Sequence, residues 1–185
     1  AAGFTVIANG EMYNYLVLTG QFGLKDQLKT GSDFEPLLHI FAREGERAFD
    51  RLRGMYALCL IGADGRVWLA RDPFGIKPLY YRQVFGKLAF ASEPRALLGS
   101  GKIEIETEPL DDLLALNYAA GRQTPFRGVR RVKPGEVAEV IYGRLAPKRV
   151  RSPLPPLLPA TRPPKSEPEA LDQLDRVLED SVRVH

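Results

Sequence analysis

The pattern of apolar and polar positions predicts that the chain opens with a buried strand. Residues 4–8 are an almost continuous apolar run, and Asn9 and Gly10 follow it directly. An Asn-Gly pair after such a run is typical of a tight polar turn, so the strand is predicted to end there. A turn of this kind can aim a side-chain amide and a backbone N–H at one point, which is the geometry of an oxyanion hole. A plain hairpin turn is the commoner interpretation of the same pair.

Helical spacing follows in two stretches. Apolar positions scattered over residues 12–28 indicate a helix that is interrupted by one of its glycines. A second pattern runs from Asp33 to about Glu44, with Asp33 at the position of an N-cap side chain. Asp33 is therefore either a helix cap or a ligand-binding carboxylate, and the two roles are compatible.

The middle of the chain is rich in predicted strands. These strands lie at residues 55–61, 67–70, 80–81, 88–91 and 137–142, the last with a partner after Gly143. Short helices are predicted at residues 93–98 and 109–119. Residues 151–168 include seven prolines and are predicted to form a semi-rigid linker. Residues 169–184 then resume helical spacing, with an apolar side that must pack against something.

Composition narrows the class of protein. The 185 residues are 44% hydrophobic and 26% charged, which fits a globular protein. No apolar stretch approaches the ~20 residues of a membrane span. A single cysteine excludes an internal disulfide and favours a cytoplasmic location. Basic residues cluster between Arg127 and Arg151, but no nucleic-acid-binding motif accompanies them, so they indicate a solvated face or a face for another domain.

The reactive side chains present are few. Cys59 is the only thiol, but it lies in an apolar run with no neighbouring base, so we interpret it as a small buried hydrophobe. His39 lies between Leu38 and Ile40 and is interpreted as a packing residue. We predict no metal site because no Cys, His, Asp and Glu cluster has ligand spacing, and we find no phosphate-binding loop.

Five blocks, taken in order, carry a family resemblance. They are NGEMYNY at residues 9–15, TGSDFE at 30–35, LRGMYA at 52–57, LARDPFGIKPLYY at 69–81 and FASE at 90–93. The chain resembles, over about residues 4–150, the glutaminase domain of glutamine-dependent asparagine synthetases, which are class II amidotransferases with an N-terminal nucleophile. The resemblance implies an α+β fold of two stacked antiparallel sheets flanked by helices.

The resemblance also implies a division of the chain. Residues 1–150 would be a type 2 glutamine amidotransferase domain that lacks its N-terminal part, residues 151–168 a linker, and residues 169–185 the first helix of a synthetase domain. No cofactor is expected in this chain, because ATP and Mg²⁺ would bind only in the synthetase domain. The expected partners are glutamine and that domain, with no nucleic acid or membrane. A homodimer is left open.

The family's site residues map onto the first blocks. The resemblance places the side-chain amide of Asn9 and the backbone N–H of Gly10 in the oxyanion hole as catalytic groups, and assigns substrate binding to Asn9, Glu11 and Asp33. It also suggests that Arg71 and Asp72 form an ion pair beneath the site.

The family nucleophile is a cysteine at position 1, where this chain has Ala1. The resemblance therefore implies that the nucleophile and the arginine for the substrate carboxylate lie outside this sequence, and that this chain by itself is inactive. Two functions stay open: a glutaminase that supplies ammonia to an asparagine synthetase-type domain, and a degenerate scaffold or interaction domain. An acceptor other than aspartate is open as well.

Overall fold

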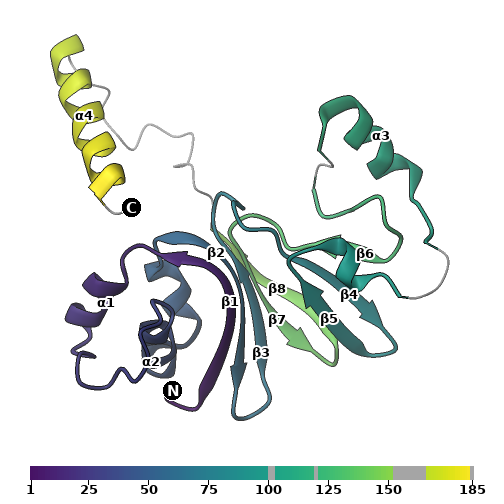
Figure 1. Cartoon of the computed structure of the whole chain (residues 1–185), viewed down its shortest axis with the longest axis horizontal. Coiled ribbons are helices and arrows are strands. Elements are labelled where there is room, and N and C mark those ends of the chain that lie inside the picture. Colours follow the sequence, from purple (N-terminus) through teal and green to yellow (C-terminus); the bar gives the residue numbers. More distant parts are fainter. Residues whose placement is uncertain (100–102, 119–120, 152–165, 184–185) are drawn as a thin grey trace. The chain divides into compact units, whose positions relative to one another are not determined.

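Antiparallel strands dominate the architecture, as the sequence predicts. The computed structural model describes residues 1–99, 103–118, 121–151 and 166–183. Its strands are β1 Phe4–Met12, β2 Gly54–Gly62, β3 Val67–Arg71, β4 Tyr80–Val84, β5 Lys87–Ala91, β6 Val129–Arg131, β7 Glu136–Ile141 and β8 Arg144–Val150. Five of them form one sheet in the order β1-β2-β3-β7-β8, and three form another in the order β5-β4-β6 (Figure 1). Every pairing between these strands is antiparallel.

The helical segments fall into two units of the chain. They are α1 Tyr15–Gln21, α2 Glu35–Glu44, η1 Gly45–Arg51, η2 Pro94–Leu97, α3 Thr107–Leu116 and α4 Glu167–Arg183. Contacts divide the chain into residues 1–152 and 153–185, so α4 belongs to the second unit. Most of the predicted Pro-rich linker lies outside the described residues. In α4 itself the apolar side chains, such as Leu171 and Leu178, are exposed.

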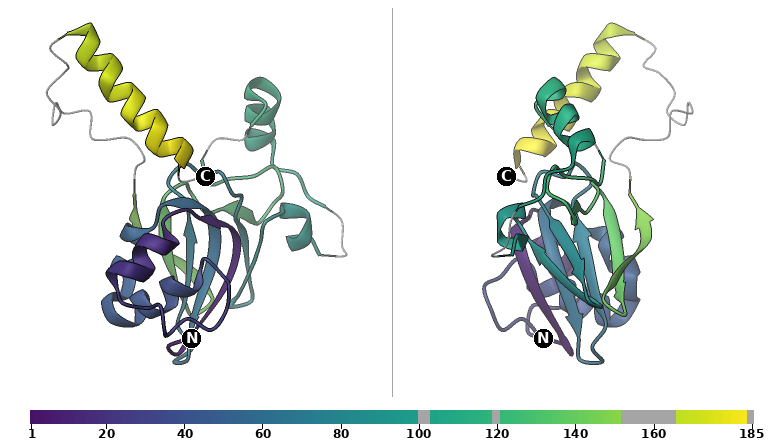
Figure 2. Two further views of the ribbon diagram at one scale, coloured as in Figure 1. Left: turned by 60° about the vertical axis from the view of Figure 1, so that its left-hand side comes forward. Right: turned by 90° about the vertical axis from the view of Figure 1, so that its right-hand side faces the viewer.

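The five-stranded sheet has a separate apolar core on each of its faces. On one face, Leu58 and Leu60 of β2 join the buried side chains of α1, α2 and η1. On the other face, Ala57 and Cys59 of β2 pack against the three-stranded sheet. Strand alternation explains this division, because successive side chains point to opposite faces. The layers are therefore helices, sheet and sheet, and the views in Figure 2 show the same arrangement.

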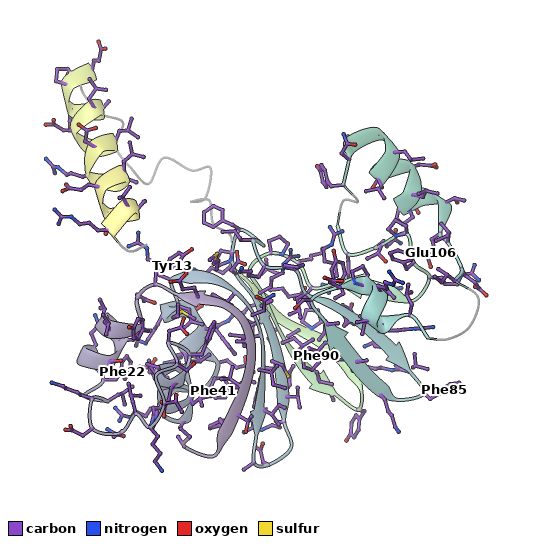
Figure 3. All side chains as sticks on the ribbon, viewed as in Figure 1. Tyr13, Phe22, Phe41, Phe85, Phe90 and Glu106 are labelled. Atoms are coloured by element: carbon purple, nitrogen blue, oxygen red, sulfur yellow. The ribbon has the colours of Figure 1, made fainter. Side chains whose placement is uncertain are left out.

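Phe41 lies at the centre of the core beneath the helices (Figure 3). Its ring contacts Trp68 edge-on at 4.8 Å between centroids, and it also contacts Phe4 at 5.1 Å and Phe49 at 5.5 Å. Edge-to-face aromatic pairs stabilise by about 0.5–1.5 kcal/mol beyond the burial of their area. This cluster ties α2 and η1 to β1 and β3.

The predicted turn at Asn9 and Gly10 is wrong. Strand β1 continues through both residues to Met12, with Asn9 opposite Ala57 and Gly10 opposite Tyr56. Gly10 has φ +150°, a conformation that a residue with a side chain rarely adopts, so this position in the strand favours glycine. Long-range pairing with β2 thus overrides the local turn preference.

Two hairpin tips, one from each sheet, meet at an unusual contact. Phe85 joins β4 to β5 and Tyr142 joins β7 to β8, and both have left-handed φ angles of 48° and 49°. Their side chains are 98% and 94% exposed, and Figure 3 shows Phe85 at the end of its hairpin. The glycines that follow lie against each other: a Cβ on Gly143 would lie 1.7 Å from the carbonyl oxygen of Gly86.

We predict that Trp68→Ala lowers the free energy of unfolding by about 3–5 kcal/mol, because the ring is fully buried and its loss leaves a cavity. Urea denaturation would measure this change. Leu114→Ala, at a position in α3 that is 74% exposed, should change stability by no more than about 0.5 kcal/mol. Equal effects of the two substitutions would contradict the assignment of Trp68 to the core.

Candidate functional site

The outer edge of β1 is the centre of the candidate site. Among the described residues, β1 pairs with β2 alone, which leaves its other edge open. Asn9 lies opposite Ala57, which belongs to the core between the sheets. Asn9 and Glu11 therefore lie on the face of β1 that is turned toward the three-stranded sheet. Met12, on the other face, is buried with the helices.

The side chain of Asn9 extends from β1 toward the three-stranded sheet. Its Nδ2 donates to the Oγ of Ser92, just after β5, at 3.4 Å. Both residues line a cavity of about 250 Å³ whose walls come from β1, β2 and β5. The sequence analysis did not single out Ser92, although it lies in the FASE block. Asn9 and Ser92 are the polar side chains of this cavity, and its other walls are apolar.

The backbone N–H of Gly10 points to the open edge. Met12 N–H donates outward to Asp33, whereas Tyr13 N–H donates inward to the carbonyl of Arg53. Alternate residues of a strand direct their N–H groups to the same edge, so Gly10 shares the direction of Met12. The carbonyl of Tyr56, opposite Gly10, accepts from Asp72 on the far side of β2, which agrees with this direction.

Asp33 is not the cap of α2. The N-cap residue is Phe34, and no side chain caps the helix there. The carboxylate of Asp33 instead accepts the N–H of Met12, which brings it to the open edge of β1. Of the two roles that the sequence left open, the helix cap is therefore wrong. The binding role stays a prediction.

Glu11 is exposed on the same strand as Asn9. The pKa of Tyr13, two residues further along, responds to the charge of Glu11. Burial raises the pKa of Tyr13, and the carboxylates of Glu11 and Asp72 raise it further. The structure thus brings Asn9, Gly10, Glu11 and Asp33 to one short stretch of strand edge.

Glu35 anchors the loop that carries Asp33. It is only 4% exposed, and its carboxylate accepts the N–H groups of Lys29 and Thr30 and the hydroxyl of Thr30, all at 2.7–2.8 Å. Burial alone would raise the pKa of Glu35, but these hydrogen bonds outweigh it and lower the pKa below its ordinary value of 4.5. The sequence analysis missed this role, because its partners are mostly backbone groups.

Arg71 and Asp72 brace the loop behind the site. Sequence reasoning expected them to pair with each other, but their hydrogen bonds go to the backbone. Arg71 donates to the carbonyls of Gly75, Lys77 and Val132. Asp72 accepts the N–H groups of Phe74, Ile76 and Lys77. Because Asp72 also donates its N–H to Tyr56, this loop is fixed against the strand that faces Gly10.

Cys59 is unsuited to act as a nucleophile. Its side chain is fully buried in the core between the sheets, and burial raises its pKa to about 12. The thiolate, which is the reactive form, is thus a negligible fraction at neutral pH. His39, on α2, has a buried Nε2 with no hydrogen-bond partner in the described part of the chain, and its role on the helix surface or in packing stays a prediction.

The described residues contain neither a metal-binding cluster nor a membrane-spanning helix. In residues 1–99, 103–118, 121–151 and 166–183, no three His, Cys, Asp or Glu side chains are grouped so that they could hold a metal ion. In the same residues, no helix combines the length and the apolar character that crossing a membrane requires.

The family of the chain follows from its likeness to known proteins. Residues 1–150 match the family model described as a glutamine amidotransferase domain, and the chain belongs to that family. It is 34% identical over 190 residues to a candidate glutamine-hydrolysing asparagine synthetase of Mycobacterium bovis. The alignment covers 98% of this chain and 29% of the relative. It is 37% identical over 135 residues to asparagine synthetase 1 of Bacillus subtilis. This second alignment covers 71% of this chain and 21% of the relative.

This is therefore a glutamine amidotransferase domain of the kind found in asparagine synthetase-like proteins. The chain spans less than a third of the length of these relatives. Among solved structures, the glutamine phosphoribosylpyrophosphate amidotransferase of Bacillus subtilis aligns with a TM-score of 0.54 at 22% identity, covering 80% of this chain and 29% of that one. This likeness confirms the predicted fold class.

We predict that Gly10→Ala destabilises the domain by about 2–3 kcal/mol, through overpacking and backbone strain. An added Cβ would lie 2.0 Å from the carbonyl oxygen of Met55. Gly20→Ala, in α1, is the matched control, because no atom lies within 4 Å of its added Cβ. Urea denaturation should show loss of stability for Gly10→Ala only, and a neutral Gly10→Ala would contradict the close approach of β1 and β2.

The lowered pKa of Glu35 predicts a pH dependence of stability. Folding favours the charged form, so the contribution of Glu35 is complete above its ordinary pKa of 4.5 and fades as the pH falls through the lower folded value. The destabilisation caused by Glu35→Gln should therefore be largest at neutral pH and shrink below pH 4.5. Unfolding by urea across this range tests the sign. Glu108→Gln, on exposed α3, should show no such trend.

Proposed function

We propose that this domain binds glutamine at the open edge of β1 and supplies the oxyanion-stabilising part of a glutaminase site. The observation that carries the proposal is that three groups lie at one short stretch of β1, two at its open edge and one on its face toward the three-stranded sheet. They are the Asn9 amide, the Gly10 N–H and the Asp33 carboxylate. The membership of the glutamine amidotransferase family supports the same choice of substrate.

The proposed roles follow from the chemistry of amide hydrolysis. The Asn9 amide and the Gly10 N–H donate to the oxyanion of the tetrahedral intermediate, and losing one such donor typically costs about 3–4 kcal/mol of barrier. Asp33 and Glu11 pair with the α-ammonium group of glutamine, because a carboxylate accepts strong hydrogen bonds from a cation.

The nucleophile is a thiolate that attacks the side-chain amide carbon of glutamine. The C–S bond forms, the C–N bond breaks, and the proton that the thiol gave up on activation leaves with the ammonia; water then hydrolyses the thioester, which gives glutamate and restores the thiol. Cys59 cannot fill this role, since it is buried and its pKa is about 12. We propose that the nucleophile belongs to a segment that pairs along the open edge of β1, where it would face Gly10.

The ammonia is proposed to serve a synthetase domain, as the names of the relatives suggest. ATP and Mg²⁺, which the family resemblance implies, are proposed to bind in that domain. Helix α4 is proposed to begin that domain. The helix is amphipathic, and its exposed apolar side, which includes Leu174 and Val177, would be buried there. Aspartate is the proposed acceptor, and the cytoplasm is the proposed location.

A glutamine-mimicking diazoketone, which alkylates the nucleophile of a glutaminase, tests the proposal on the native gene product. We expect intact mass to show one adduct, and peptide fragmentation to place it on a residue other than Cys59. Asp33→Asn should slow labelling at least about tenfold, because one charged hydrogen bond to the ammonium is lost. Asp64→Asn, which removes the partner of exposed Arg66, should leave the rate unchanged.

Two results would oppose the proposal. An adduct on Cys59 would place the chemistry in the core rather than at the edge. No adduct at all would leave the domain as a scaffold that keeps the fold of the family without its reaction.

A further inference from the structure

The side chain of Glu35 closes the segment before α2 into a loop, and the hydroxyls of Thr30 and Ser32 also accept hydrogen bonds within it. Glu35 is the first residue of α2, yet its carboxylate turns back to residues 29 and 30. One oxygen accepts the N–H of Lys29, and the other accepts both the N–H and the hydroxyl of Thr30. These contacts close a ring that contains Asp33.

The carboxylate of Glu35 is buried, and its hydrogen bonds hold it in place. Glu35 is almost fully enclosed, and a buried carboxylate is stable only while its hydrogen bonds are made. Three donors, two of them backbone amides, satisfy it. Any movement of the loop would break charge-assisted hydrogen bonds to a carboxylate that is only 4% exposed, which makes movement costly.

The ring also determines what Asp33 can do. A Ser-Asp pair before a helix normally caps it, and Ser32 here does accept the N–H of Phe34. With the loop closed by Glu35, Asp33 extends away from the helix and accepts the N–H of Met12, which is 21 residues earlier in the chain. The position of Asp33 at the strand edge is thus a consequence of the ring.

We propose that Glu35 is a positioning residue that holds Asp33 against β1 for the ammonium group of glutamine. The importance for glutamine rests on the proposed function, but the link from Glu35 through Asp33 to Met12 can be tested without glutamine. Glu35 itself does not touch the substrate in this scheme.

The first measurement is hydrogen exchange of the Met12 amide by NMR on the whole chain. Glu35→Gln keeps the shape of the side chain but removes its charge and turns one acceptor into an NH₂ donor facing amide donors. The loop should loosen, and the Met12 amide should exchange about tenfold faster or more, the size of one charged hydrogen bond. Glu44→Gln, at the other end of α2, removes the partner of Arg51 and should leave this amide unchanged.

The second measurement is a double-mutant cycle on glutamine affinity, by calorimetry. If Glu35 acts through Asp33, then Glu35→Gln should weaken glutamine binding in the wild-type background and add almost nothing in the Asp33→Asn background. Thr30→Val removes the hydroxyl that donates to Glu35 and accepts the N–H of Ser32, and should act in the same direction with a smaller effect. This milder variant keeps the test valid if Glu35→Gln does not fold.

The outcomes separate the two proposals. Faster Met12 exchange with non-additive losses of affinity supports both. Faster exchange in a chain that never binds glutamine supports the positioning role and overturns the proposed substrate. Unchanged Met12 exchange in Glu35→Gln and Thr30→Val, or losses that add fully to those of Asp33→Asn, would overturn the positioning role.

Discussion

The ladder between β1 and β2 is the constraint on which the rest of the structure depends. It pairs nine residues, and at its end Gly10 and Gly54 allow the two backbones to approach closely. Because side chains and N–H groups alternate along a strand, this register decides the direction of each functional group. Asn9 faces the second sheet, the Gly10 N–H faces the open edge, and Met12 is buried among the helices. A shift by one residue would reverse all of these directions.

The charged groups around the site share a second property: they are held by backbone atoms. Glu35 binds backbone amides before α2, Arg71 binds three carbonyls, and Asp72 binds three amides. Hydrogen bonds to charged groups offset the cost of removing those charges from water. They also fix loops that contain no regular structure. The loops around the site are therefore held by charged side chains that bind the backbone.

The sequence predicts the hairpins well, because turn residues and apolar runs alternate plainly from residue 55 onward. The sequence-based prediction fails where contacts between residues far apart in the chain decide the local structure. The pair at Asn9 and Gly10 has a local turn signal, yet β2 extends the strand through it. Asp33 has a local capping signal, yet Met12 takes its carboxylate. The role of Glu35 gives almost no signal, since backbone amides carry no side-chain pattern. The family blocks therefore indicate the site residues, but not what positions them.

The touching hairpin tips link two parts of the chain that are otherwise remote in sequence. The backbones of Gly143 and Gly86 are in contact. The residues before them, Tyr142 and Phe85, have left-handed φ angles that fix the path of each turn. A side chain at Gly143 would lie 1.7 Å from the carbonyl oxygen of Gly86, so the β7–β8 turn can change there only if the β4–β5 turn moves. In evolutionary terms, the glycine at position 143 is inherited together with the turn at Phe85 and Gly86, and related sequences that keep that turn should keep the glycine.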